Sequence, residues 1–373
     1  MSKQLYFRYP FEGKPTPVPM LGFFCYRPTV YLKLFGLPMV KALAELGLKN
    51  QYRRLTRFSA EPNQKLLLKT LREMVAAFPI SMTAPEVMAD LAQTIDGCPE
   101  ARRRVNELSF TETLFLGMDL ARNEWQRRHV YLVLLERTGL QAQSLFNAGD
   151  VKSAVAYMKE HPLVRTLLWP EALEVLDEAA DSAALLPLTA AMSLDAHLGW
   201  LAAWDLDDSE NRGLMAPQFA CLLPTLERPG RNPTSLLFDE LQRRAGAATV
   251  SELLDGGARL PELDVGTLYR WSAGTHFPDA DTLTMLMAAH QLNDPKDILY
   301  RQFAAAKLIN LIGFLSQEIS VKVAERGATR AGWPWPAYPV GHPSFEAWMA
   351  TRYPFWLNYH RANENALAEL ARA

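Results

Sequence analysis

Hydrophobic positions along most of this chain recur at the spacing of an α-helix. Between residues 39 and 226, apolar side chains return every three or four positions, and apolar and polar residues do not alternate over any useful length. A period near 3.6 indicates helices that bury one face, whereas strands need a period of two. The pattern therefore predicts an all-α fold with a multi-helix N-terminal body over residues 39–228.

Local signals support particular helices within this body. Asp150 precedes an amphipathic stretch from Val151 to Lys159 and is expected to accept hydrogen bonds at the start of a helix. The apolar run over residues 183–204 contains Asp195 and His197. Because charged groups near the middle of a membrane span are costly, this run predicts a buried core helix rather than a membrane helix.

The first 38 residues differ from the body in composition. They contain six prolines among many phenylalanines and tyrosines. Proline at this density prevents a continuous helix, and so many aromatic side chains argue against a free disordered tail. We expect an extended arm over residues 1–38 that docks on the helical body or on a second copy of the protein. A free arm that binds another partner is the alternative.

The second half of the chain divides at a segment rich in proline and glycine. Residues 227–233 have the composition of a linker and mark the clearest expected domain boundary. We expect a compact unit over residues 233–292 after it. The C-terminal helices would then occupy residues 295–373, beginning with a long apolar helix over residues 295–326.

The unit over residues 233–292 carries the start and stop signals of four short helices. The first is expected over residues 235–245, and Thr249 with Glu252 forms a capping pair for the second. Asp264 is placed to cap the third, Gly274 to end it in a left-handed conformation, and Asp279 to cap the fourth. The apolar spacing predicts one shared core: Leu241, Leu253, Leu268, Trp271, Leu283 and Leu286.

The third and fourth helices are separated by a glycine stop and then a proline break at Pro278. This order over residues 235–291 resembles the helix-turn-helix domain of phage repressors of the Cro and lambda-repressor type. The resemblance implies that the N-terminal face of the third helix enters the major groove of DNA. By position, the residues that would read the bases are Asp264, Val265, Gly266, Thr267 and Arg270. The candidate DNA-contacting side chains are Thr267, Tyr269, Arg270, Arg243 and Arg244.

Other features of this unit suit DNA less well. Val265 and Gly266 offer no side-chain hydrogen bond, and the turn before the third helix looks about four residues longer than in the resembled class. Four arginines stand against eight carboxylates between Pro233 and Gln291, a formal charge of −4. Phosphate contacts supply most non-specific affinity for DNA. The partner is therefore either double-stranded DNA or, if groove reading has been lost, a protein or a second copy of this chain.

Three further groups of basic residues lie in the N-terminal body. They could form a phosphate-binding face or, alternatively, solvated helix faces paired with glutamates. The three groups are Arg53, Arg54 and Arg57; Arg102, Arg103 and Arg104; and Arg122, Arg127 and Arg128.

The densest carboxylate cluster follows the apolar run. Asp205, Asp207 and Asp208 begin like a calcium-binding loop, but Glu210 stands where that loop needs glycine. We expect a solvated loop here and assign no metal. A metal-dependent helical enzyme using residues 205–210 is the competing interpretation. Asp195 with His197 is the first acid–base candidate, and a hydrogen-bonded core pair is the alternative.

Composition narrows the setting of the protein. The net charge of −2 gives no global attraction to nucleic acid, and the three cysteines lie far apart along the 373 residues. With no apolar N-terminal signal, this predicts a cytoplasmic protein without a disulfide framework. We expect a non-catalytic regulator that binds DNA or a protein, with no cofactor and no membrane association. A scaffold with a degenerate helix-turn-helix unit is a further alternative.

Overall fold

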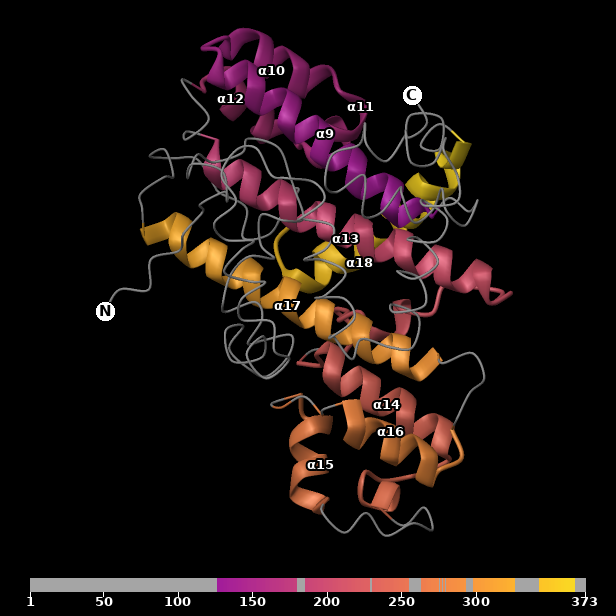
Figure 1. The fold of residues 1–373 in the computed structure, drawn as a ribbon. Coiled ribbons are helices and arrows are strands. Elements are labelled where there is room, and N and C mark those ends of the chain that lie inside the picture. Colours follow the sequence, from indigo (N-terminus) through magenta and orange to yellow (C-terminus); the bar gives the residue numbers. More distant parts are fainter. Residues whose placement is uncertain are drawn as a thin grey trace, which may run out of the picture. The chain divides into compact units, whose positions relative to one another are not determined.

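The computed structural model describes residues 126–179, 185–228, 230–254, 263–274, 276, 278, 280–292, 298–325 and 342–365. Within these ranges every regular element is an α-helix or a 3-10 helix, and no strand is present (Figure 1). The all-α prediction is therefore confirmed. The aromatic arm, the arginines at 53–57 and 102–104, and Asp279 lie outside the described residues.

The chain forms two compact units. The first comprises residues 1–200 and 360–373, and the second comprises residues 201–359. Residues 227–233, the expected linker, lie within the second unit. Each unit is described by itself below.

In the first unit, α9 (Arg127–Asn147) packs against α10 (Val151–Glu160), and α10 also contacts α11 (Pro162–Leu167) and α12 (Pro170–Asp177). The predicted cap of α10 is confirmed, because the Asp150 carboxylate accepts from the Ser153 amide at 3.1 Å. Pro162 and Pro170 begin their helices, where a missing N–H costs no hydrogen bond.

The apolar run forms most of α13 (Leu186–Asn211) and is buried. Asp195 and His197 lie inside this core, and the His197 ring donates from Nδ1 to the Ser193 carbonyl at 2.5 Å. The prediction of a buried core helix is confirmed over the described part of the run. The hydrogen-bonded histidine fits the core interpretation of these two residues.

The sequence predicted that the carboxylate cluster after the run is a solvated loop, and this prediction is wrong. Asp205, Asp207 and Asp208 belong to the last turns of α13, and all three are buried. The expectation failed because aspartate, serine and asparagine have low helix propensity in isolation, and long-range contacts override that preference here.

The second unit contains η1 (Ala220–Leu222), α14 (Pro233–Ala245), η2 (Ser251–Leu254), α15 (Val265–Ser272), α16 (Ala280–Ala289), α17 (Ile298–Glu325) and α18 (Phe345–Ala362). α14 lies against α17, α15 and η1 (Figure 1). The Asn310 amide of α17 donates to the Thr234 hydroxyl of α14 at 2.7 Å. α17 thus supports the first helix of the unit expected over residues 233–292.

α17 is also the one described helix long and apolar enough to cross a membrane. Its window Ile298–Ser316 has a mean hydropathy of 1.3, and half of it is buried inside the protein. Length and composition are weak evidence, since core helices of soluble proteins have the same properties.

Candidate functional site

The unit over residues 233–292 begins with a capped helix, α14. The Asn232 side chain accepts from the Ser235 amide at 3.0 Å, and the Ser235 hydroxyl accepts from the Asn232 amide at 2.9 Å. This reciprocal pair and Pro233 start α14 two residues before the predicted position. Gly246 ends the helix with φ of 67°. An asparagine before proline is a readable helix-start signal, so Asn232 could have been recognised from the sequence.

The second helix of the unit is a short 3-10 helix, η2. The Thr249 hydroxyl accepts from the Glu252 amide at 3.4 Å. The Glu252 carboxylate accepts from the Ala248 amide at 2.7 Å rather than from the Thr249 amide. The predicted pair of residues therefore does cap this helix, with one partner shifted by one residue.

The third helix, α15, has both predicted ends. The Asp264 carboxylate accepts from the Thr267 amide and from the Thr267 hydroxyl, each at 2.8 Å. These hydrogen bonds hold the pKa of Asp264 below its usual value. At the other end, Gly274 has φ of 72°. A Cβ at Gly274 would lie 1.8 Å from Asn232 Nδ2, so α15 ends directly against the cap of α14.

The predicted core of the unit is confirmed, because all six predicted residues are buried. The Phe238 and Trp271 rings lie 6.0 Å apart and join α14 to α15. The His290 ring, just after α16, donates from Nε2 to the Leu253 carbonyl of η2 at 2.7 Å. Four elements that are separate in sequence therefore share one interior.

The opposite face of α15 is exposed. Val265 and Tyr269, one helical turn apart, are 39% and 51% exposed, while Leu268 and Trp271 point into the core. Met285 of α16 is 47% exposed. Gly266 also lies on this surface and carries no side chain. α15 therefore offers an apolar and aromatic surface to a partner, and we call Val265, Gly266 and Tyr269 the α15 face.

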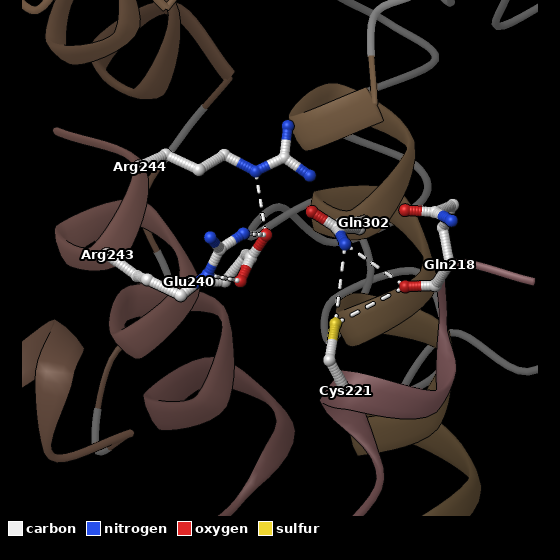
Figure 2. A network of polar contacts seen from close by, with 6 residues as sticks. All are labelled: Gln218, Cys221, Glu240, Arg243, Arg244 and Gln302. Carbon is white, nitrogen blue, oxygen red and sulfur yellow. Dashed lines mark hydrogen bonds and ion pairs between the residues drawn. The ribbon is translucent and has the colours of Figure 1, made fainter. Parts of the chain in front are cut away.

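Two of the candidate DNA-contacting arginines bind a carboxylate of their own helix. Arg243 donates to both oxygens of Glu240 at 2.8 and 2.7 Å, and Arg244 Nε donates to the same carboxylate at 2.7 Å (Figure 2). Partial burial raises the pKa of Glu240, but these hydrogen bonds and charges outweigh it and keep the pKa low. The positive charge of both arginines is thus shared with a nearby anion.

The third candidate arginine, Arg270, is held in a similar way. Its guanidinium donates to the Thr267 hydroxyl at 2.7 Å, and that hydroxyl donates to Asp264. Thr267 and Arg270 therefore belong to the capping network of α15. Tyr269 and Arg270 are the exposed candidate side chains on this helix, and Tyr269 is 51% exposed.

A thiol lies in the same polar network but lacks the properties of a nucleophile. Gln302 donates to the Gln218 carbonyl at 3.0 Å and to Cys221 Sγ at 3.3 Å, and the thiol donates to the same carbonyl (Figure 2). The Cys221 residue is exposed overall, but its sulfur packs against these groups. Burial of the sulfur, together with Glu240 and Asp205, raises its pKa to about 11. A protonated thiol at neutral pH is inert.

The carboxylates of α13 hold the second unit together. Asp205 accepts from the Gln218 amide at 2.7 Å, from the Phe219 amide at 2.9 Å and from the Tyr353 hydroxyl of α18. Burial raises the pKa of Asp205, and these hydrogen bonds offset part of that effect. Sequence reasoning missed Tyr353, and no local signal at residue 353 points to a carboxylate 148 residues away.

Asp208 has a similar structural role. Its carboxylate pairs with Arg212 at 3.2 Å and with Arg301 of α17 at 3.6 Å. In the part of the chain that the structure describes, no three histidine, cysteine, aspartate or glutamate side chains gather as metal ligands. The structure thus uses Asp205 and Asp208 to connect α13 with η1, α17 and α18.

The described part of the N-terminal basic clusters is partly buried. Arg127 is 9% exposed and pairs with Glu364 at 2.7 Å. Its cluster neighbour Arg122 lies outside the described residues. Arg127 therefore does not contribute an open cation to a phosphate-binding surface, and its neighbour Arg128 is half-buried.

Comparisons of the chain with protein-family models, with curated proteins and with solved structures found no match. Function must therefore be argued from the geometry of this chain.

Proposed function

We propose that this protein is a non-catalytic regulator that uses its helix-turn-helix-like unit to recognise another macromolecule, and that the partner at the α15 face is a protein. One observation carries the proposal: α15 exposes Val265 and Tyr269, whereas its arginine bonds within the helix. A DNA reader would need the reverse, with free cations and polar side chains facing the groove.

The chemistry of the α15 face suits a protein interface. Tyrosine contributes a large, rigid surface with one polar group, and it is enriched among the residues that dominate binding energies. Val265 adds apolar area one turn away, and Gly266 between them leaves the backbone accessible. Burial of this face by a partner would remove apolar surface from water.

The charge of the unit indicates the kind of protein it would bind. Its eight carboxylates exceed its four arginines, so the unit carries a formal charge of −4. Complementary charges steer encounters and exclude wrong partners. The partner would therefore carry an apolar patch bordered by lysine or arginine.

Site-specific photocrosslinking tests the proposal. A photoreactive phenylalanine analogue replaces Tyr269 in the full chain within its own cells, and Glu174 of α12 serves as the exposed control position. We expect a protein adduct from position 269 that is absent from position 174 and is lost in Val265→Asp. A nucleic-acid adduct, or no adduct from position 269, would overturn the proposal.

DNA is the second candidate, because the four-helix order resembles phage repressors and Arg270 is exposed on α15. Electrophoretic mobility shifts with mixed-sequence duplexes test it, starting at about 50 mM salt and rising to about 200 mM. A retarded complex that weakens steeply with salt and is reduced by Arg270→Ala would favour DNA over protein. We expect no complex.

A further inference from the structure

We propose that the second unit holds a binding site for an uncharged planar nitrogen heterocycle of the nucleobase or nucleoside class. The site is a pocket of about 360 Å³ between the start of α14, the middle of α17 and the start of α18. It is separate from the α15 face, so it stands whether or not that face binds a protein.

The size of the pocket limits the ligand. Pockets that bind small molecules usually measure about 300–1,000 Å³, so this one lies near the lower end of that range. It would accommodate a molecule with one or two rings, and a sugar attached to such a ring would extend toward solvent. Larger cofactors would not fit within it.

Aromatic side chains form part of the wall. Phe314 of α17 and Phe345 of α18 both line the pocket. Gly313 permits this arrangement, because a Cβ at that position would lie only 3.1 Å from the Phe345 ring. Flat aromatic rings bind heterocycles by stacking, with little dependence on which base is bound.

One asparagine of the wall leaves hydrogen-bonding capacity toward the pocket, whereas the Asn232 carboxamide lies against Gly274. Asn310 donates from Nδ2 to Thr234, and its Oδ1 remains as an acceptor. A carboxamide oxygen of this kind can accept from an amino or ring N–H group on the edge of a base.

The charged groups favour a neutral ligand with amino groups. Arg231 lines the pocket but pairs with Asp239, so its charge is already balanced. Glu346 adds a carboxylate that can accept from amino N–H groups. An anion such as a phosphate would meet this carboxylate without an opposing free cation. The site therefore suits a base or nucleoside better than a nucleotide.

A ligand in the pocket would also affect the end of α15. Asn232 lines the pocket, caps α14 and lies directly against Gly274 at the end of α15. A ligand that fixes the Asn232 side chain would therefore stabilise the junction between these two helices.

Isothermal titration of the full-length protein with adenosine, guanosine, cytidine and uridine tests the proposal. We expect saturable binding of at least one nucleoside with Kd below about 1 mM, a modest value for a ligand of this size. The corresponding 5′-monophosphate should bind no more tightly than the nucleoside.

Two variants and one matched control locate the site. Glu346→Gln and Asn310→Leu should each weaken binding about tenfold, the effect of losing one hydrogen bond to the ligand. Glu174→Gln removes a distant exposed carboxylate and is the control, which should leave Kd unchanged.

The proposal would be overturned if none of the four nucleosides bound saturably at millimolar concentration. It would also be overturned if Glu346→Gln and Asn310→Leu both left the affinity unchanged, or if the monophosphate bound ten times more tightly than the nucleoside. Glu346 is partly exposed and its glutamine variant keeps the same shape, so the test does not depend on Asn310→Leu folding. Crosslinking at position 269 tests only the proposed protein interface of the α15 face, and nucleoside titration tests only the pocket. Failure of one proposal is therefore distinguishable from failure of the other.

Discussion

Asp205 and Asp264 both accept backbone N–H groups, but they do so in opposite surroundings. Asp205 is buried and joins the end of α13 to Gln218, Phe219 and Tyr353. Asp264 is exposed, and its hydrogen bonds go to Thr267 within its own helix start. One carboxylate therefore holds distant segments together, whereas the other organises eight residues of α15.

The comparison separates two kinds of functional signal. The carboxylates of α13 are clustered as in a metal site, yet the structure uses Asp205 and Asp208 for internal contacts. The α15 segment has fewer reactive side chains, yet it leaves Val265 and Tyr269 exposed. What a region can do for a partner depends on the groups that the fold leaves unused.

Removal of the buried carboxylate should have the largest effect. Asp205→Ala leaves the Gln218 and Phe219 amides and the Tyr353 hydroxyl without their acceptor in a buried site. At 1–3 kcal/mol for each orphaned group, the free energy of unfolding should fall by about 5 kcal/mol. Urea denaturation measures this, and Asp264→Ala is the matched control. Equal losses in the two variants would show that Asp205 is no more than a local cap.

Trp271→Ala tests the interior of the α15 region. Trp271 is 7% exposed and packs against Phe238, so truncation should lower the free energy of unfolding by about 3–5 kcal/mol. Tyr269→Ala, on the exposed face of the same helix, is the control and should cost far less. A small loss in Trp271→Ala would contradict the shared core of α14 and α15.

Gly274→Ala tests the junction between α15 and the cap of α14. The left-handed backbone costs about 1 kcal/mol without glycine, and displacement of Asn232 removes a cap worth about 1 kcal/mol more. We expect a total loss of about 2 kcal/mol in chemical denaturation. Gly246→Ala has a similar φ but open space around it, so it should show the backbone cost alone. Equal losses would mean that Asn232 moves freely.

The smallest effect is a difference in pH dependence between the two aspartates. Because the pKa of Asp205 is raised above 3.8, the stability it contributes should fall as pH rises from 3.8 through the folded value. Because the pKa of Asp264 is lowered below 3.8, its contribution should fall as pH drops from 3.8 through the folded value. Thermal denaturation of the unchanged protein, Asp205→Asn and Asp264→Asn between about pH 3 and pH 6 measures the stability that each substitution removes. This loss should shrink with rising pH for Asp205→Asn and grow with rising pH for Asp264→Asn. If both losses changed in the same direction, burial would not be the dominant influence on Asp205.

Local features of the fold could be predicted from the sequence. Asp150, Asp264 and Gly274 act within a few residues of their own positions, and each was predicted correctly. The apolar spacing likewise identified the buried face that contains Leu268 and Trp271. Signals of this kind succeed because the capping atom and its partner are neighbours in the chain.

Long-range partners could not be predicted in the same way. The interpretation of residues 205–210 as a solvated loop was wrong because it weighed local propensity without Tyr353 and Arg301. Helical spacing, by contrast, could have predicted the pairing of Glu240 with Arg243 and Arg244, which lie three and four residues further along α14. The pocket beside Asn310 arises from three elements and has no signature in any one of them.

The sequence by itself determined the all-α class, the boundaries of several helices and the apolar faces that they bury, because periodicity and capping operate over one or two helical turns. The tertiary structure alone decided which polar groups are used internally and which remain available. Asp205 became a structural hub through contacts with residues up to 148 positions away, while Tyr269 stayed exposed because no other segment covers that face of α15 among the described residues. Whether a polar or apolar group is available for function depends on desolvation by distant segments, a property that no local pattern encodes.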